Sequence, residues 1–477
     1  MKRFQLIFVL ALLVAAFAVR LYKIDRPIAD WHSWRQADTA AVSRNFIKEG
    51  YTPFVPKYDD MSSQTNGKDN PNRYRFVEFP IYNSIVAFVW YFTGIKDIYA
   101  RLTTAIITVI STLFLYLIVS RYSGRKTALL SAFFFAFIPY NIFYSTTVLP
   151  GPTMVFFLLL SYFTFQKWLD KQKVIWLLIC SIATSAAILT WPIALIFTFP
   201  IVYLAFEKYH FSIFKKPYLW AFAIVSIVPF LAWRLWMINY PAGIPNWQFL
   251  INEGNIRFKG AFFQWIFAER LGNLILTFGG VPLFILGLIR KPGREKLFYF
   301  SILFSSLAYV VIFASGNVRH DYYQIPIIPS LAIFLAIGTK TLFTLPKETF
   351  NRYIGPVIAL ILICFIFAFG YYQIRGYYWI NKPEIVKAGK AVDRLLPKDA
   401  IVIAPYNGDT AFLYQTNRHG YPIVDRPLEK FIDDGTKYLV SVDVGDAGIQ
   451  NLAKHCKVID QTKEYLIVEM FKDCIGK

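Results

Sequence analysis

The chain carries little charge for its length. Only 17% of its 477 residues are Asp, Glu, Lys or Arg, whereas a soluble domain carries about 25%. Hydrophobic residues make up 56%, and apolar runs of about 15 to 22 residues recur between residues 4 and 372 before they stop. Runs of about 20 residues match the thickness of a bilayer. The composition excludes a soluble globular protein and predicts a polytopic membrane protein with a more polar tail.

The chain also lacks a separate basic domain and any nucleic-acid-binding motif, although its net charge is +20. Its basic residues sit mostly in short loops between apolar runs, where the positive-inside rule accounts for them. We therefore expect no nucleic-acid partner.

Cysteine is scarce, with four in the chain. Cys180 and Cys364 lie within apolar runs and are expected to be packing residues. Cys456 and Cys474 both lie in the polar tail, where an oxidising compartment would permit a disulfide. The sequence does not give the geometry that a disulfide needs, so pairing and free thiols both remain open. His455 next to Cys456 supplies too few ligands for a zinc site.

The first apolar run, residues 4–19, follows Lys2 and Arg3. Residues 16–18 (AFA) resemble a signal-peptidase site, so a cleaved signal peptide is the competing interpretation. With many apolar runs to follow, we expect an uncleaved anchor and a cytoplasmic N-terminus. Residues 25–46 would then be extracytoplasmic.

Whether the short apolar segment at residues 80–94 crosses the membrane decides the side on which every later loop lies. At about 15 residues it suits an interfacial helix better than a span. About eleven spans are then expected, at residues 4–19, 101–120, 127–143, 152–168, 174–190, 192–206, 218–238, 271–289, 297–315, 325–342 and 354–372.

The charges in the loops support this arrangement. The loops placed inside carry Arg121, Arg125, Lys126, Lys167, Lys171, Lys173, Lys208, Lys215, Lys216, Arg290, Lys291, Arg294, Lys296, Lys340, Lys347 and Arg352. The short loops placed outside carry only Arg319. This asymmetry is what the positive-inside rule requires, and it places the C-terminal tail outside.

The predicted fold is therefore an all-α polytopic membrane bundle with a small C-terminal α/β domain. Residues 1–376 would form the transmembrane domain, with outer loops at 21–100 and 239–270. Residues 377–477 would form the soluble domain. Its expected strands, at 400–404, 438–442 and 465–469, are rich in β-branched and aromatic residues, and its expected helices lie at 409–414 and 448–455.

The outer stretch at residues 25–46 is dense in ionisable groups beside the first span. It holds Asp30, His32, Arg35 and Asp38, and Glu78 follows later in the same loop. A carboxylate near an apolar boundary is costly to ionise without a partner. The three acids are therefore candidate bases, metal ligands or members of ion pairs.

Plainer interpretations of these acids remain open. Asp30 or Asp38 could cap a helix over residues 39–46, and Arg35 with Asp38 could form a local i,i+3 ion pair. Glu78 could cap the helix that starts after it, since proline favours the first turn.

A second cluster occupies the outer end of two spans. Arg319, His320, Tyr322 and Tyr323 combine a cation with neighbouring donors, which suits a phosphate headgroup. The alternative is an interfacial anchor, because Tyr and Arg are common at membrane boundaries.

The order of these features resembles the GT-C superfamily of membrane glycosyltransferases, in the branch of protein O-mannosyltransferases and lipid A aminoarabinose transferases. The resemblance rests on a long acidic first outer loop and on three segments. Residues 78–82 (EFPIY) resemble a charged-residue–Pro–Pro–Leu element. The span opening with RLTT at residue 101 and ending in RYSGR at residue 121 resembles an Arg-Leu start with a basic end. Residues 320–329 (HDYYQIPIIP) resemble an aromatic–Pro–x–x–Pro segment.

The chain departs from the family pattern at two places. The Asp-Glu pair that usually opens the first loop would fall at Arg35 and Gln36, and the acids stand at Asp30 and Asp38 instead. The turn at residues 144–152, where the family tends to place an acid, has Gly151.

The resemblance implies an integral-membrane glycosyltransferase at the cell membrane with an outward-facing active site and a polyprenyl-phosphate sugar donor. A carboxylate would deprotonate the acceptor hydroxyl, which then attacks the anomeric carbon with inversion. Asp30 is the first choice of base and Asp38 the second, with Glu78 assisting.

His32, Arg35, Arg319, His320, Tyr322 and Tyr323 would bind substrate. Arg319 and His320 would stabilise the leaving phosphate, and a divalent metal, Mg or Mn, is the alternative stabiliser. The acceptor would be a glycan, a lipid or a protein.

Two rival functions remain. A transporter or flippase of lipid-linked sugars would place ionisable residues inside its spans, and the expected spans are nearly free of them. A catalytically inactive envelope scaffold is the other, because Gly151 and the displaced acids depart from the family pattern.

Overall fold

The computed structural model describes residues 3–63, 66–344, 351 and 353–475. Lys2, which precedes the first expected span, and Lys347 and Arg352, assigned above to an inner loop, lie outside the described residues. The chain divides into two compact units, each described separately below. The bundle unit comprises Met1–Ile24, Arg101–Arg234 and Trp247–Gly376, and the loop–tail unit comprises Asp25–Ala100, Leu235–Asn246 and Tyr377–Lys477.

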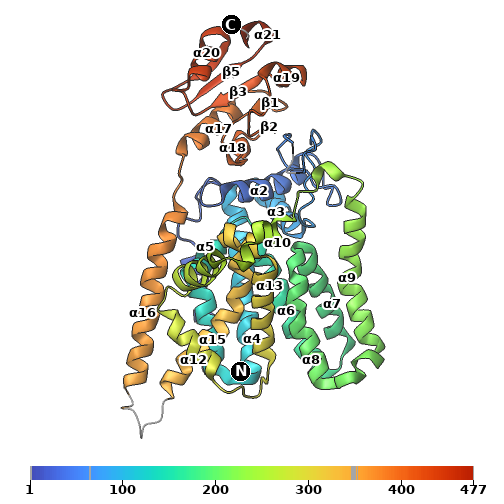
Figure 1. Ribbon diagram of the computed structural model, residues 1–477, viewed down its shortest axis with the longest axis vertical. Coiled ribbons are helices and arrows are strands. Elements are labelled where there is room, and N and C mark those ends of the chain that lie inside the picture. The colour runs from blue at the N-terminus through green and yellow to red at the C-terminus, as the bar shows by residue number, and fades with distance from the viewer. Residues whose placement is uncertain (1–2, 64–65, 345–350, 352, 476–477) are drawn as a thin grey trace. The chain divides into compact units, whose positions relative to one another are not determined.

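The bundle unit is helical (Figure 1). Its helices are α1 (Arg3–Val19), α4 (Asp97–Phe137), α5 (Pro139–Tyr144), α6 (Gly151–Lys171), α7 (Val174–Thr190), α8 (Phe199–Tyr209), α9 (Pro217–Met237), α10 (Phe249–Asn252), α11 (Gly260–Phe263), α12 (Gly280–Ile289), α13 (Phe298–Ile312), α14 (Ala314–Arg319), α15 (Ile328–Phe343) and α16 (Ile354–Ile374). A π-helical stretch, Gln264–Ile275, precedes α12. Helices α4 and α9 each begin or end within residues of the loop–tail unit.

Among the described residues, five helices are long and apolar enough to cross a membrane. They are Asp97–Phe137, Pro192–Lys215, Pro217–Met237, Asp321–Phe343 and Ile354–Leu395. A sixth is formed if Gly260–Ile275 and Gly280–Ile289, which meet at 112°, count as one span. Shorter apolar helices lie at Leu6–Val19, Ile81–Thr93, Val174–Thr190 and Phe298–Ile312. Several apolar helices are thus confirmed, and the count of eleven stays a prediction.

Two of the expected spans meet inside α4. The helix is broken at Gly124, whose φ of 77° lies in the left-handed region, within the basic segment expected to form an inner loop. Glycine adopts this conformation without the strain that a Cβ would introduce. The second of these spans ends at Phe137 rather than at residue 143, because α5 begins as a separate helix at Pro139.

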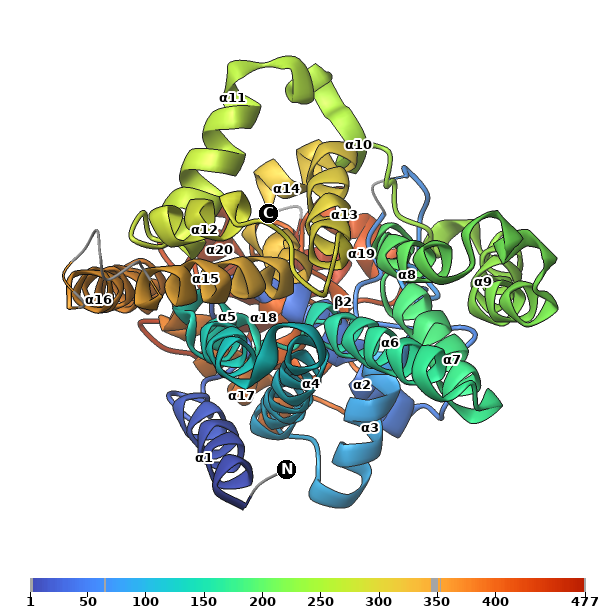
Figure 2. The ribbon, with the colours of Figure 1, turned by 90° about the horizontal axis from the view of Figure 1, so that it is seen from below.

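Helices α12 and α15 pack at unusually close range. A Cβ built on Gly338 would lie 1.8 Å from the Leu283 carbonyl oxygen, and one on Gly287 would lie 2.1 Å from the Phe334 carbonyl oxygen. Small residues at such crossings let helix backbones approach in membranes. The view in Figure 2 shows α12 beside α15, and α6 beside α7.

The loop–tail unit contains two helices of the first loop, α2 (Ser33–Lys48) and α3 (Ile81–Thr93). It also contains a five-stranded sheet in the tail, in the order β2-β1-β3-β5-β4. Strand β1 (Ile401–Ile403) pairs in parallel with β2 (His419–Tyr421) and β3 (Tyr438–Ser441), while β5 (Leu466–Glu469) runs antiparallel to β3 and β4 (Lys457–Gln461). The helices of the tail are α17 (Pro383–Leu395), α18 (Ala411–Thr416), α19 (Leu428–Asp433), α20 (Ala447–His455) and α21 (Lys472–Ile475).

The small α/β tail expected from the sequence is confirmed. All three expected strands are present, as are both expected helices, with shifted ends. The sequence prediction missed β2, β4, α17, α19 and α21. Cys456 and Cys474 form a disulfide, with Cα atoms 5.0 Å apart, so the open question of pairing is resolved.

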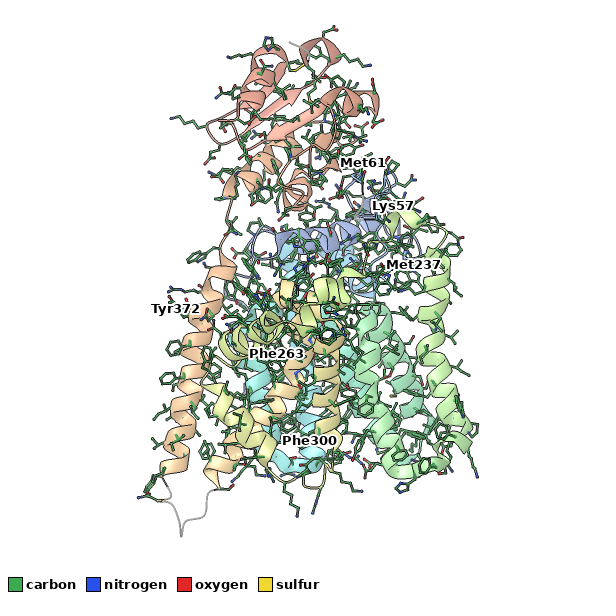
Figure 3. The ribbon with its side chains drawn as sticks, in the orientation of Figure 1. Lys57, Met61, Met237, Phe263, Phe300 and Tyr372 are labelled. Atoms are coloured by element: carbon green, nitrogen blue, oxygen red, sulfur yellow. A yellow bond between two sulfur atoms is a disulfide. The ribbon has the colours of Figure 1, made fainter. Side chains whose placement is uncertain are left out.

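One segment of the first loop joins the sheet at strand β2. Asp60 forms a parallel bridge with Gly420, and the Met61 amide donates to the Gly420 carbonyl at 2.8 Å. The Met61 side chain packs against the tail core (Figure 3). A Cβ on Gly420 would lie 1.7 Å from the Val402 carbonyl oxygen of β1, so β1 and β2 can pair this closely only at a glycine.

Candidate active site

Helix α2 places most of the predicted site residues. Its sequence, SWRQADTAAVSRNFIK, has three alanines in its middle, and alanine is the strongest helix former. All residues from Arg35 to Phe46 are buried. Because this helix is polar yet buried on all sides, its charged side chains require partners, and each of those described below has one.

The three candidate carboxylates are each paired with an arginine, and none of them is a helix cap. Helix α2 begins after His32 and α3 begins after Pro80, and neither N-cap residue makes a side-chain capping bond. The capping interpretations of Asp30, Asp38 and Glu78 are therefore wrong.

Asp30 is held inside the unit by its own loop. Its Oδ2 lies 2.5 Å from Arg26 Nε, and its Oδ1 accepts from Gln36 Nε2 at 2.8 Å. The Arg26 guanidinium lies over the Tyr378 ring at 4.9 Å. The Asp30 side chain has no exposed surface, so this carboxylate is enclosed by its partners.

Arg35 pairs with Glu78 rather than with Asp38. Its Nη2 lies 2.8 Å from both Glu78 carboxylate oxygens. Asp38 instead lies 2.6 Å from Arg75 Nη2, and its other oxygen accepts from Thr410 Oγ1 at 2.6 Å. The local Arg35–Asp38 ion pair considered from the sequence is therefore wrong.

A pocket brings two of the three acids together. It is lined by Arg35, Asp38, Thr39, Val42, Pro56, Arg75, Val77, Glu78, Pro80 and Asn83. Two guanidinium groups and two carboxylates thus share one concave surface whose remaining walls are partly apolar. Charged groups that converge in a pocket make it a candidate binding or active site. Asp30 does not line it.

His32 lies at the turn that starts α2. The backbone of His32 has a φ of 55°. This value lies in the left-handed region, which is uncommon for residues with a Cβ. Its ring packs edge-on against Trp31, with ring centroids 5.2 Å apart. Such strained positions cluster at functional sites, although this geometry alone gives His32 no chemical role.

The predicted phosphate-binding residues lie in the bundle unit. The Arg319 guanidinium is half exposed and forms an ion pair with Glu253, and it lies 5.5 Å from the Phe249 ring. The His320 ring stacks on Tyr322 and Tyr323, both of which are buried.

Several polar residues of the bundle unit were missed. Tyr144 donates to Asp321 Oδ1 at 2.5 Å. Arg20 and Arg101, both fully buried, reach the uncharged turn after α5, where they donate to Ser145 Oγ at 2.7 Å and to the Thr146 carbonyl at 2.9 Å. The sequence signal available for Arg101 was its place at the start of a span. Its contact with the Thr146 carbonyl joins residues that are 45 positions apart in the sequence.

In the loop–tail unit, the missed contacts are those between side chains in or next to α2 and residues that lie further along the sequence. Arg44 forms an ion pair with Asp59, and Asp59 also accepts from Asn45 Nδ2 at 3.1 Å. His419 lies 3.7 Å from Asp59 and 3.1 Å from Glu49. Burial lowers the pKa of His419, but the hydrogen bonds to Asp59 and Glu49 outweigh it, and the pKa is raised.

The described residues do not supply a preformed metal site. In that part of the chain, no three or more His, Cys, Asp and Glu side chains gather where they could hold a metal ion. Each candidate carboxylate already faces a guanidinium. The residues therefore do not fit a divalent metal as they stand, and no step below uses one.

Comparison with known proteins adds a family match over part of the chain. Residues 77–236, about a third of the chain, match the model of the dolichyl-phosphate-mannose-protein mannosyltransferase family. This match includes Glu78 and the span opened by Arg101. No curated protein matches the sequence.

Solved structures match nearly the whole chain. ArnT from Cupriavidus metallidurans, bound to undecaprenyl phosphate, is 16% identical with a TM-score of 0.67, over 98% of this chain and 99% of that one. The oligosaccharyltransferase of Archaeoglobus fulgidus, in a complex with Zn and sulfate, is 14% identical with a TM-score of 0.58, over 91% and 68%. The oligosaccharyltransferase AglB of the same organism, with an inhibitory peptide and a dolichol-phosphate, is 12% identical with a TM-score of 0.56, over 96% and 73%.

The chain has the fold of the GT-C membrane glycosyltransferases, and its residues 77–236 match the model of a mannosyltransferase family. At less than 25% identity the solved structures show the fold alone, and the family match, over a third of the chain, indicates glycosyltransferase activity. The predicted resemblance and the predicted enzyme class are both confirmed. The apolar helices indicate a multi-pass membrane protein, and the donor, acceptor, base and orientation are proposed below.

Proposed function

We propose that this glycosyltransferase transfers a sugar from a polyprenyl-phosphate donor to an extracytoplasmic acceptor hydroxyl with inversion, with Asp38 as the base. The observation that carries the choice of Asp38 is the pocket, which Asp38 and Glu78 line together with Arg35 and Arg75. This reverses the order expected from the sequence, in which Asp30 came first, because Asp30 is enclosed by Arg26 and Gln36.

In the proposed reaction, Asp38 removes the proton of the acceptor hydroxyl as its oxygen forms a bond to the anomeric carbon. The bond from that carbon to the phosphate oxygen breaks, and its electron pair leaves with the polyprenyl phosphate. Phosphate is a good leaving group, so no strong general acid is needed. Glu78 holds Arg35 in the pocket by their ion pair.

Cations would stabilise the charge that develops on the leaving phosphate. Arg35 in the pocket is one candidate, and Arg319 with His320 is the group predicted from the sequence. His32, Tyr322 and Tyr323 are proposed to contact substrate. The bound undecaprenyl phosphate of ArnT and the dolichol-phosphate of AglB support a lipid-phosphate donor here.

For orientation, we propose a cell-membrane protein with its N-terminus in the cytoplasm, a transferase domain over residues 1–376 and an extracytoplasmic domain over 377–477. The loop charges support this sidedness. The disulfide between Cys456 and Cys474 supports it independently, because disulfides persist in oxidising compartments.

The test uses the full-length protein in membranes with mannosyl-undecaprenyl phosphate as the labelled probe. Release of undecaprenyl phosphate reports cleavage of the sugar–phosphate bond, which a flippase or an inactive scaffold would not produce. Asp38→Asn is expected to lower release at least a hundredfold, within the range that a general base contributes. Asp30→Asn and Glu78→Gln are assayed beside it.

Full activity in all three variants would overturn the carboxylate mechanism. If Asp30→Asn alone lost the release of undecaprenyl phosphate, Asp30 and not Asp38 would be assigned as the base. Mass spectrometry of envelope glycans and glycoproteins, with and without the protein, then identifies the sugar and shows whether the acceptor is a glycan, a lipid or a protein.

A further inference from the structure

The C-terminal tail contacts the start of α2 at one turn, residues 409–410. Thr410 Oγ1 lies 2.6 Å from Asp38 Oδ1 and 3.1 Å from the Trp34 carbonyl oxygen. Ser33 Oγ donates to Asp409 at 2.9 Å, and the other Asp409 oxygen accepts from the Ala411 amide at 2.7 Å. Thr410 is 9% exposed, so its hydroxyl is committed to these partners.

We propose that Thr410 is a positioning residue for the catalytic Asp38, an inference that rests on the proposed function. The tail is then a part of the active site rather than a cover over it. Helix α18 is held by further contacts that do not involve Thr410, to α2 and to the start of α4. Arg44 donates to the Tyr414 carbonyl at 2.9 Å, and Tyr414 donates to Asp97 at 2.8 Å.

A hydroxyl suits both protonation states of a base. It carries one proton and two acceptor lone pairs. While Asp38 is ionised, Thr410 donates to it. Once Asp38 holds the acceptor proton, the Thr410 hydroxyl rotates to donate to the Trp34 carbonyl and accepts from the carboxyl. Both arrangements keep the hydrogen bond between Thr410 and Asp38 without moving a heavy atom.

The surrounding charges explain why a neutral donor is useful. The second Asp38 oxygen is paired with Arg75, whose guanidinium also lies over the Tyr58 ring at 5.1 Å. The pocket adds Arg35 and Glu78, and the carboxylates of Asp60 and Asp409 lie near enough to interact electrostatically with Asp38. A second cation on Asp38 would stabilise its ionised form and weaken it as a base, whereas a hydroxyl fixes its orientation at smaller cost.

The experiment compares Thr410→Val, which is close in shape but has no hydroxyl, with Thr410→Ser, which keeps it. Full-length protein is assayed for release of undecaprenyl phosphate from mannosyl-undecaprenyl phosphate across a pH series. Thr410→Val is expected to lower kcat roughly tenfold, the scale of a hydrogen bond to a charged group. The KM for the donor should be unchanged, and the acid limb of the pH–rate profile should move to higher pH. Thr410→Ser should restore both kcat and the profile.

Thr436→Val is the matched control. Thr436 is a fully buried tail residue whose hydroxyl has no hydrogen-bond partner among the described residues, so the same substitution should leave kinetics unchanged. A thermal melt of each variant checks that the tail is folded. Wild-type kcat and pH profile in Thr410→Val would overturn the proposal, as would equal losses in the Val and Ser variants.

The Asp38→Asn variant separates this inference from the proposed function. If Asp38→Asn keeps full transfer, Asp38 is not the base and both proposals fail. If Asp38→Asn loses transfer while Thr410→Val keeps it, only the role of Thr410 fails.

Discussion

Arg35 and Glu78 join helix α2 to the segment that leads into α3 through a single guanidinium nitrogen, Nη2, which lies 2.8 Å from both carboxylate oxygens. Both side chains are at most 10% exposed. A second link runs alongside, where Asn83 of α3 donates to the Thr39 carbonyl at 2.7 Å. The ion pair is therefore both a wall of the pocket and a joint between two helices.

Removing one partner of this pair should destabilise the protein more than removing both. Glu78→Gln removes the carboxylate that faces the buried Arg35 guanidinium, and removing one partner of a buried ion pair costs about 3–5 kcal/mol. The double variant Arg35→Met/Glu78→Leu removes the charge together with its partner and should melt closer to the wild type. Thermal unfolding of purified protein in detergent measures both. A double variant less stable than Glu78→Gln would contradict this account.

The membrane part of the fold was predictable because its signals are long and local. Apolar runs and loop charges indicate helices whatever their neighbours are. The tail was harder. Strand β2 has three residues, one of them Gly420, and β4 is polar and largely exposed at the sheet edge, so neither shows the apolar alternation that predicts a strand.

The candidate site was predictable in its acids but not in their partners. Asp38 and Glu78 could be recognised because a carboxylate near an apolar boundary is costly. Nothing local to Asp38 indicates Arg75 or Thr410, and the latter is 372 residues away in the chain. Such partners are set by how the loop and the tail pack, and a single sequence does not specify that.

Asp60 should make the protein less stable as the pH rises. Burial, with a smaller contribution from the charge of Asp38, raises the pKa of Asp60 to about 6, although hydrogen bonds from Ser62 and Tyr58 oppose the shift. Between its unfolded value of 3.8 and about 6, the folded state holds more protons than the unfolded state, so the folding free energy weakens as the pH rises. Above a pH of about 6, the cost of ionising Asp60 in the folded state is present in full and amounts to about 3 kcal/mol.

Asp60→Asn removes that penalty. The variant should therefore melt higher than the wild type at pH 7.5, with the difference shrinking towards pH 4.5. Asp69→Asn, an exposed carboxylate of the same loop, serves as the control and should show no such pH-dependent gain. Equal melting of Asp60→Asn and wild type at pH 7.5 would show that Asp60 does not carry the penalty.

The crossing of α12 and α15 should not tolerate a methyl group. Gly338→Ala would place a Cβ 1.8 Å from the Leu283 carbonyl, so the helices must separate, and overpacking of this kind typically costs about 1–3 kcal/mol or more. The added Cβ of Gly376→Ala would meet no atom of the described residues within 4 Å, so this variant is the matched control. Melting temperatures in detergent should fall for Gly338→Ala alone. An unchanged melting temperature would mean that the two helices are not so close.

The Cys456–Cys474 disulfide should stabilise the tail and report its compartment. It closes a loop over a separation of 18 residues, for which restriction of the unfolded chain is worth about 3 kcal/mol. The double variant Cys456→Ser/Cys474→Ser should expose the tail to limited proteolysis faster than wild type. Cys364→Ser, which removes an exposed free thiol, should not.

The state of the two thiols in cells provides the sharper measurement. Membranes are quenched with N-ethylmaleimide before lysis and digested without reductant, so that only bonds formed in the cell survive. A linked pair of peptides containing Cys456 and Cys474 is expected, because an extracytoplasmic tail is exposed to an oxidising compartment. Recovery of both cysteines as alkylated thiols would contradict the outside placement of the tail, and with it the sidedness inferred from the loop charges.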